Sequence, residues 1–330
     1  MLTTKIGDFE TSRIALGAWA IGGGSWWGDN DDKESIEAVR ASVDGGVTLI
    51  DTAPAYGFGH SEVVLGKALV GIRDKVRIST KAGLVWDTDE GAWFFEKEGY
   101  TMRRNLSKKS IMKEAEDSLK RMNTDRIDIY FTHWPCLPEF PTPVGETMEA
   151  LLKLKEQGKI LAIGVSNTSP ENLGEYFKYG KVDLIQEKSS ILSRSSMDAL
   201  GEITKANDIV FQPYSPLESG LLTGKLGRDY VAQEGSARAI NAWFEPKRFA
   251  AALDMLDLWQ PLCEKYDATT GQLAIAWMAA LGDRMSVLCG ARTVEQALSN
   301  VKSAQIELSD EDIGLMSKTA EDVIAECGAV

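Results

Sequence analysis

Eight short apolar segments of strand character alternate with amphipathic helical segments along almost the whole chain. Alternation of this kind predicts an α/β fold with a parallel sheet. Eight repeats favour a sheet closed into a (β/α)8 TIM barrel, and an open doubly wound sheet is the alternative. The predicted strands are residues 13–16, 47–50, 76–80, 127–131, 160–165, 182–185, 209–212 and 286–289.

The glycines near the first strand separate these two arrangements. Gly17 and the run Gly22-Gly23-Gly24 follow that strand, but no G-x-G-x-x-G sequence opens the next helix. An open sheet that binds a dinucleotide in the Rossmann manner places that glycine sequence at this turn. We therefore expect the closed barrel, with residues 1–330 forming one domain.

Two of the helices have clear start signals. Asp31 and Ser107 each precede a segment with helical spacing, where a short polar side chain can accept hydrogen bonds from free N–H groups of the first turn. The residues expected on the buried faces are Ile36, Val39 and Val43 in the first helix and Ile111, Ala115, Leu119 and Met122 in the second.

The charge of the chain restricts its partners. Its formal net charge is -13, and such a surface repels polyanions, so we expect neither nucleic acid nor an anionic membrane as a partner. The four cysteines lie far apart without a C-x-x-C pair, which argues against a metal site or a disulfide framework. Because no secretion signal and no apolar run near the ~20 residues of a membrane span are present, we expect a cytoplasmic protein.

Two segments, residues 82–106 and 220–245, are longer than the usual connections of a barrel. Both are rich in aromatic residues, which is typical of loops that form the rim of an active site. The alternative is that these rings only cover the core. The rings are Trp86, Trp93, Phe94, Phe95 and Tyr100 in the first segment and Trp243 and Phe244 in the second.

Polar side chains stand just after six consecutive predicted strands. The carboxyl ends of barrel strands share one face, where catalytic groups gather. Any one of these residues could be a cap, a solvated residue or a core residue, but six in a row are hard to explain by packing. They are Asp51, Lys81, His133, the pair Ser166-Asn167, Gln186 and the pair Tyr214-Ser215.

Tyr56, in a glycine-rich turn beyond Asp51, completes a set suited to protonating a carbonyl oxygen. A free phenol has a pKa of about 10. An ammonium group from Lys81 is expected to lower that pKa, with Asp51 keeping the lysine charged and oriented. His133 could donate to, or orient, the same carbonyl oxygen. Hydride addition builds negative charge there, so the reaction needs a general acid among preorganised donors.

The segment after the eighth predicted strand has the features of a phosphate site. Thr293 and Gln296 have the spacing of a capping box, so a helix begins there, and Gly290 and Arg292 lie where free N–H groups favour a phosphate. An ordinary capped helix is the alternative. We expect Val294, Ala297, Leu298 and Val301 to face inward.

The loop after the seventh predicted strand would complete this phosphate site, because barrels commonly place one in their last two loops. Gly220 and Gly224 allow close approach of the backbone, and Lys225 adds positive charge. A flexible loop without a ligand is the alternative.

Seven motifs give the chain a specific resemblance to the aldo-keto reductase superfamily over essentially its whole length. They are GAWAIGG, DTAPAYGFGHSE, STKAG, THWP, GVSN, YSPLESGLLTGK and GARTVEQALSN, in the family's order. The resemblance implies a (β/α)8 barrel that binds NADP(H) across the carboxyl-terminal face, with NAD(H) accepted less well. Two of the motifs, DTAPAYGFG and SGLLTGK, are similar to the bacterial branch that acts on sugars, polyols and small aldehydes.

The resemblance also implies roles for individual residues. Asp51, Tyr56, Lys81 and His133 match the catalytic tetrad, with Tyr56 as general acid/base. The nicotinamide carboxamide would be held by Ser166, Asn167 and Gln186, and its ring would stack on Tyr214. The other cofactor contacts are expected at Trp19, at Ser215, Leu217, Gly220 and Lys225 near the pyrophosphate, and at Gly290, Arg292, Gln296 and Asn300 at the adenosine end.

Two positions depart from the family pattern. Ser189-Ser190 stands where the family usually has a Tyr-Asn pair, which bears on the substrate pocket. Ser299 replaces the usual glutamate beside Asn300 and implies weaker hydrogen bonding to adenine.

Two other functions are compatible with parts of the pattern. A Schiff-base lyase would use Lys81 as a nucleophile, but it needs neither Tyr56 nor the phosphate loop. A non-enzymatic reductase-like subunit would bind cofactor and a partner protein, against which the intact tetrad argues. A homo-oligomer is also compatible with the sequence. The tryptophans that could wall a substrate pocket, or belong to the core, are Trp19, Trp26, Trp27, Trp86 and Trp134.

Overall fold

The computed structural model describes residues 1–330 and contains a closed barrel of eight parallel strands. This confirms the predicted (β/α)8 barrel and excludes the open sheet. All eight predicted strands are present, with bounds that differ by at most three residues. In order around the barrel they are β3(Ile14–Gly17), β4(Leu49–Asp51), β5(Arg77–Ala82), β9(Ile127–Thr132), β10(Ile160–Ser166), β11(Leu184–Lys188), β12(Val210–Tyr214) and β13(Val287–Gly290).

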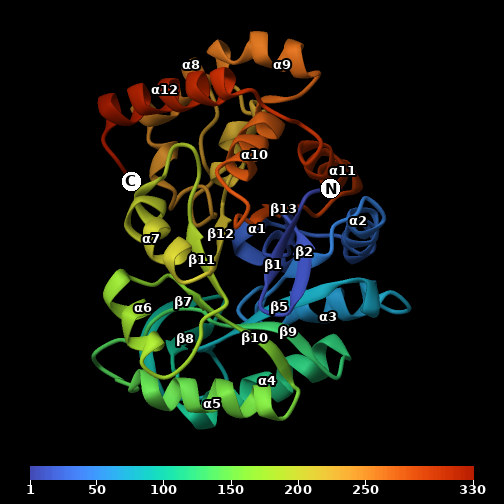
Figure 1. The fold of residues 1–330 in the computed structure, drawn as a ribbon, viewed down its shortest axis with the longest axis vertical. Coiled ribbons are helices and arrows are strands. Elements are labelled where there is room, and N and C mark those ends of the chain that lie inside the picture. Colours follow the sequence, from blue (N-terminus) through green and yellow to red (C-terminus); the bar gives the residue numbers. More distant parts are fainter.

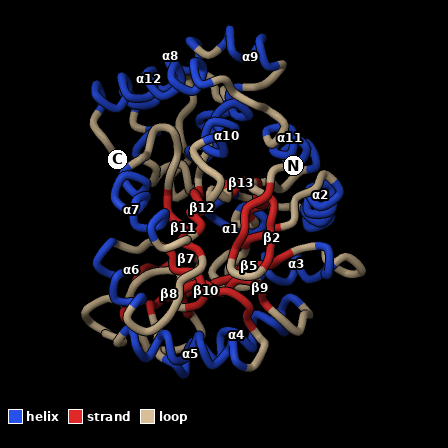
Figure 2. The backbone as a smooth tube through the Cα atoms, viewed as in Figure 1, coloured by secondary structure: helices blue, strands red, loops and turns tan.

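Helices follow every barrel strand and cover the outside of the barrel (Figures 1 and 2). They are α2(Asp32–Asp44), α3(His60–Ala68), α4(Lys108–Met122), α5(Val144–Glu156), α6(Pro170–Phe177), α7(Ser195–Ala206), α10(Thr270–Ala280) and α11(Val294–Ser303). Beyond this ring, α8(Pro246–Leu258), α9(Gln260–Tyr266) and α12(Asp310–Cys327) lie together at the top of Figure 1, where α12 packs against α8. No helix combines the length and the apolar character that a membrane span would need.

Both predicted helix starts are confirmed. The side chains of Asp31 and Ser107 accept hydrogen bonds from backbone N–H groups in the first turns of α2 and α4. The predicted buried face of α4 is confirmed at Ile111, Ala115, Leu119 and Met122. On α2, Val39 is buried, whereas Ile36 and Val43 are only half-buried, because this helix turns its small residues toward α3 and α11.

The helix predicted at Thr293 is also present, and the Thr293 hydroxyl caps α11 by accepting from the N–H of Gln296. Its buried face differs from the prediction at two positions, because Val294 is only half-buried and Leu298 is exposed. Ala297 and Val301 are buried, but Leu298 is 50% exposed. Successive helical residues point about 100° apart, so a helix that packs through Ala297 turns the next side chain outward.

A hairpin that the sequence reasoning missed closes the amino-terminal end of the barrel. It pairs β1(Thr3–Ile6) with β2(Phe9–Ser12) in antiparallel register. The fully buried Ile6 belongs to the cluster inside the barrel, together with Ile129 and Leu184. This end is therefore sealed by apolar packing, and the opposite end is left for chemistry.

The long segment of residues 82–106 also has secondary structure that was not predicted. It contains β6(Leu84–Val85), β7(Ala92–Lys97) and β8(Tyr100–Arg104), which form an antiparallel sheet in the order β6-β8-β7. Because this segment leaves the barrel after β5, it lies at the carboxyl end of the strands and contributes a folded rim there.

Candidate active site

Asp51 and Lys81 meet at the carboxyl end of the barrel, because Asp51 ends β4 and Lys81 lies near the end of the neighbouring β5. Lys81 Nζ donates to Asp51 Oδ1 at 2.6 Å and to the carbonyl oxygen of Thr52 at 2.8 Å. The other oxygen of Asp51 accepts from Ser79 Oγ at 2.7 Å and from Gln186 Nε2 at 3.0 Å. Asp51 and Lys81 are both buried, so each depends on the other for neutralisation.

Tyr56 lies beside this pair, with Lys81 Nζ 4.8 Å from the centre of its ring. Its hydroxyl makes no hydrogen bond within the chain. Burial raises the pKa of Tyr56 well above the usual value, and the negative charge of Asp51 raises it further. The net shift is therefore upward, whereas the sequence led us to expect that Lys81 would lower this pKa. Tyr56 consequently stays protonated at neutral pH, as a proton donor must.

His133 follows β9 and brings a third group to the same place. Its ring centre lies 6.0 Å from that of Tyr56 in an edge-on arrangement, and its ring nitrogens make no hydrogen bond within the chain. Burial lowers the pKa of His133 well below its usual value, and the charges of Lys81 and Arg104 lower it further. The ring is therefore neutral at pH 7 and can donate one N–H to an oxygen without losing a charge.

The three residues expected to hold a carboxamide lie close together, but their side chains have different partners. Asn167 accepts from the Tyr214 hydroxyl at 2.8 Å and donates to the carbonyl oxygen of His133 at 2.8 Å. Ser166 Oγ donates to the backbone of Gln186 at 2.7 Å. The amide of Gln186 points into the barrel toward Asp51, so Gln186 orients the carboxylate.

The loop after β12 has an unusual backbone, with φ values of 58° at Ser215, 45° at Glu218 and 93° at Gly220. Glu218 is fully buried, and its carboxylate accepts from Ser190 Oγ at 2.5 Å and from Asn241 Nδ2 at 2.9 Å. Ser190, one of the departures from the family pattern, therefore anchors this loop. Sequence reasoning missed Glu218, whose only signal was a charged residue within an otherwise apolar motif.

Three of the residues expected at the cofactor phosphates and adenosine, Lys225, Arg292 and Gln296, have contacts at the start of α11. Leu217 packs against the main core, and Lys225 reaches across to Glu295 of α11 at 2.9 Å. Gln296 accepts from the N–H of Arg292 at 3.0 Å. The first-turn N–H groups of Val294 and Glu295 have no partner within the chain, which suits an anionic ligand.

Arg292 was expected to have a side chain free to bind a phosphate, but its guanidinium already has partners within the chain. Its Nη1 donates to the carbonyl oxygens of Trp27 at 3.0 Å and Asp29 at 3.3 Å, so it ties the first loop to the eighth. Asn300 donates to the carbonyl oxygen of Gly290 at 3.1 Å and braces the same turn. Both side chains thus shape the loop from which the free N–H groups project.

A series of neighbouring rings runs from Tyr56 around to the residue after His133. Each ring centre lies 5.0 to 6.2 Å from the next. Trp27 also packs on Trp19 at 5.2 Å, whereas Trp86 packs on Phe58 at 5.7 Å. In order, the series is Tyr56, Trp19, Trp26, Phe95, Phe94 and Trp134.

The tip of the β7–β8 hairpin joins this ring series to two other loops. Glu98 accepts from the N–H of Ser25 at 2.6 Å. Lys97 lies over the ring of Trp26 at 4.0 Å and donates to the carbonyl oxygen of Gly235 at 2.8 Å. Loops after the first, third and seventh barrel strands are thereby held together over the carboxyl end.

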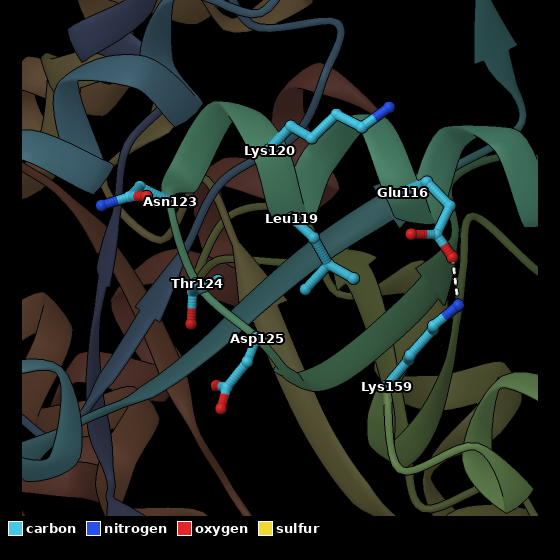
Figure 3. Close-up of a pocket in the computed structure, with 7 residues that line it drawn as sticks. All are labelled: Glu116, Leu119, Lys120, Asn123, Thr124, Asp125 and Lys159. Carbon is cyan, nitrogen blue, oxygen red and sulfur yellow. Dashed lines mark hydrogen bonds and ion pairs between the residues drawn. The ribbon is translucent and has the colours of Figure 1, made fainter.

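The groove shown in Figure 3 lies at the other end of the barrel. Its residues precede β9 and β10 or belong to α4, and an ion pair joins Lys159 to Glu116 across it. It contains none of the predicted site residues. The lining consists of Glu116, Leu119, Lys120, Asn123, Thr124, Asp125 and Lys159.

Comparison with known proteins agrees with this geometry. The model of the Aldo/keto reductase family matches residues 13–321. The chain is 45% identical over 316 residues to the NADH-specific methylglyoxal reductase of Escherichia coli, covering 95% of this chain and 96% of that protein. It is 36% identical to the aldo-keto reductase YhdN of Bacillus subtilis, covering 97% and 95%.

A solved structure gives the same result. The glycerol dehydrogenase AKR11B4 from Gluconobacter oxydans matches with a TM-score of 0.86 and 34% identity, covering 99% of this chain and 96% of that one. Three findings point to the same family: the eight-stranded barrel, the grouping of Asp51, Tyr56, Lys81 and His133 at its carboxyl end, and relatives that match along the whole sequence. The chain belongs to the aldo/keto reductase family of oxidoreductases.

Proposed function

We propose that this chain transfers hydride between a nicotinamide cofactor and a small carbonyl compound or its alcohol, with Tyr56 as the general acid/base. The observation that carries this proposal is the placement of Tyr56, whose ring lies beside the buried Lys81–Asp51 pair and whose hydroxyl has no partner within the chain. In this proposal residues 1–330 act as one cytoplasmic barrel domain.

In the direction of reduction, a bound nicotinamide supplies the hydride. The substrate carbonyl oxygen accepts hydrogen bonds from the Tyr56 hydroxyl and from a neutral His133, and the phenol proton moves to it as negative charge develops. Lys81 stabilises the tyrosinate that remains. Asp51 keeps Lys81 charged although burial lowers the pKa of that lysine. Gln186 and Ser79 fix the orientation of the Asp51 carboxylate.

The residues present fit a dinucleotide. The free N–H groups at the start of α11 suit its phosphates, the loop from Ser215 to Gly220 offers backbone at close range, and Tyr214 offers an aromatic face. Arg292 already donates from Nη1 to two backbone carbonyl oxygens, so only its Nε and Nη2 are left for a 2′-phosphate. A relative at 45% identity is NADH-specific. We therefore propose that NAD(H) is used at least as well as the NADP(H) that the family resemblance implies.

The relatives and the aromatic wall of the site support a proposal for the substrate class. One relative reduces methylglyoxal and a similar structure belongs to a glycerol dehydrogenase. Aromatic rings pack well against the C–H faces of small polyols and aldehydes. We propose small aldehydes, ketones and polyols as substrates.

The test is a spectrophotometric assay of NADH and NADPH oxidation with methylglyoxal and short aldehydes, and of NAD⁺ and NADP⁺ reduction with glycerol. Wild type should turn over at least one pair and Tyr56→Phe none at a comparable rate. Cofactor binding without turnover of any carbonyl would instead support a non-enzymatic subunit. Borohydride trapping of substrate on Lys81 would support a Schiff-base lyase, which the burial of Lys81 disfavours.

A further inference from the structure

Arg104, the last residue of β8, is a buried cation without a counter-ion. It is 9% exposed, and no carboxylate lies within ion-pair distance of it. Its Nη1 donates to the carbonyl oxygen of Pro135 at 3.2 Å, its Nε is buried without a partner, and its Nη2 makes no hydrogen bond within the chain. Buried charges are ordinarily paired, because burial without a partner costs considerable free energy.

Two other part-buried arginines are each paired with a buried carboxylate. Arg73 contacts the buried carboxylate of Asp128 at 2.7 Å, and Arg121 contacts the buried carboxylate of Glu62 at 2.5 Å. Arg104 has donors of the same kind but no such partner. Burial consequently lowers the pKa of Arg104, although a guanidinium keeps its proton at any ordinary pH.

Stacking explains how Arg104 is held in place. The centre of its guanidinium lies 3.9 Å from the centre of the Phe94 ring and 4.7 Å from that of Trp134. Stacked rings contact the faces of the guanidinium plane, whereas the N–H bonds lie in that plane. The rings therefore orient the group and leave its unpartnered N–H bonds free for an acceptor.

The position of Arg104 places this unmet charge beside the reacting groups. Phe94 and Trp134 belong to the series of rings that begins at Tyr56. Trp134 directly follows His133 in the chain, and the positive charge of Arg104 contributes to the lowered pKa of His133. Arg104 therefore lies against the segment that directly follows His133, whose ring centre is 6.0 Å from that of Tyr56.

We propose that Arg104 is a specificity-determining residue that binds the carboxylate of a short anionic aldehyde or ketone. A carboxylate suits the site because a planar guanidinium can bind it through two parallel N–H bonds, and because one cation neutralises a monoanion. This inference rests on the proposed function, since it names the substrate class that the same site prefers.

The test uses a pair of aldehydes that differ in charge and little in size, succinic semialdehyde and butanal. Wild type should show a kcat/KM about 10- to 100-fold higher for the anionic aldehyde, the range expected for hydrogen bonds between charged groups. Arg104→Met keeps an unbranched side chain that can pack against both rings but removes the charge. It should abolish this preference mainly through KM, while kcat/KM for butanal stays close to the wild-type value. Arg104→Lys should restore part of it.

Melting temperature and NADH binding are measured on both variants to show that the fold is kept. Equal losses for both aldehydes in Arg104→Met would mean that Arg104 only packs the hairpin, and the proposal would be overturned. A wild type without preference for the anionic aldehyde would overturn it as well.

A binding measurement separates this proposal from the proposed function. Butyrate is titrated into the protein while tryptophan fluorescence is recorded, because Trp134 lies against Arg104. Saturable quenching in wild type, with at least about tenfold weaker binding in Arg104→Met, supports the subsite even if no carbonyl is turned over. Equal binding by the two proteins, or no binding by either, overturns it whatever the enzyme reduces.

Discussion

Asp51 and Asp128 are both buried carboxylates that contact cations, but they lie at opposite ends of the barrel. Asp128, near the start of β9, accepts from Arg73 at 2.7 Å, from Arg77 at 3.1 Å and from the N–H of Ile78 at 2.8 Å. Both oxygens of this carboxylate accept from donors of the chain, which is typical of a structural network.

At the Asp51 end the network is incomplete. Asp51 itself accepts hydrogen bonds from three side chains. The neighbouring Tyr56 hydroxyl and the ring nitrogens of His133 make no hydrogen bond within the chain. The difference shows that a buried ion pair alone does not mark a functional site. What distinguishes the functional end is the unmet hydrogen-bonding capacity beside the pair.

The largest effect on activity is expected for Tyr56→Phe, at the functional end of the barrel. We expect kcat for carbonyl reduction to fall by about 10²- to 10⁴-fold, because the variant has no proton donor. The melting temperature should stay near that of wild type, because the removed hydroxyl makes no hydrogen bond within the chain. Steady-state kinetics and thermal unfolding of the two proteins check this, and a variant with near wild-type kcat would refute the role of Tyr56.

Asp128→Ala should have the opposite effect, with a lower free energy of unfolding and little change in kcat. The change leaves Arg73 and Arg77 without their shared partner, and breaking a buried pair in this way costs about 3–5 kcal/mol of unfolding free energy. The kcat of the folded fraction should remain close to wild type, because Asp128 lies at the sealed end. Urea unfolding and kinetics at low temperature measure both quantities. A loss of kcat without a loss of stability would contradict the division between the two ends.

A smaller effect is expected at Glu114, which accepts from the N–H of Gly83 beside the functional end at 2.9 Å. Burial raises the pKa of Glu114 from 4.5 to about 8. The folded protein therefore holds this proton more tightly than the unfolded chain. The resulting stabilisation is complete below pH 4.5 and is lost as the pH rises toward about 8, with a slope of up to about 1.4 kcal/mol per pH unit.

Glu114→Gln removes that titration and keeps an oxygen that can accept from Gly83. The free energy of unfolding, measured in urea at several pH values between 5 and 8, should fall less steeply for the variant. Some slope should persist, because burial also raises the pKa of Glu187 to about 8. Identical slopes for the two proteins would show that Glu114 is ionised in the folded state.

The smallest effect concerns the cofactor end. Because Arg292 contacts two backbone carbonyl oxygens, Arg292→Met should loosen the first loop and raise KM for NADH and NADPH alike, by roughly three- to tenfold, as for the loss of about one hydrogen bond. Kinetics with both cofactors decide the matter. A loss confined to NADPH would show that Arg292 binds the 2′-phosphate.

Much of the architecture could be predicted because its signals are local. Strand periodicity located all eight barrel strands, and the caps at Asp31, Ser107 and Thr293 located three helix starts. The β7–β8 hairpin was missed, because its rings alternate weakly and only their packing against Trp26 and Trp134 explains them. Leu298 was misplaced because helical spacing shows that a face exists but does not show how wide it is.

By itself, the sequence determined the barrel, the family and the residues that follow each strand, since the parallel order of strands brings their carboxyl ends to one face. The tertiary structure alone decided the states and partners of those residues. The high pKa of Tyr56, the inward turn of Gln186 and the missing counter-ion of Arg104 all depend on groups from distant parts of the chain. Burial and hydrogen-bond partners are set by three-dimensional packing, and local sequence patterns carry no measure of either.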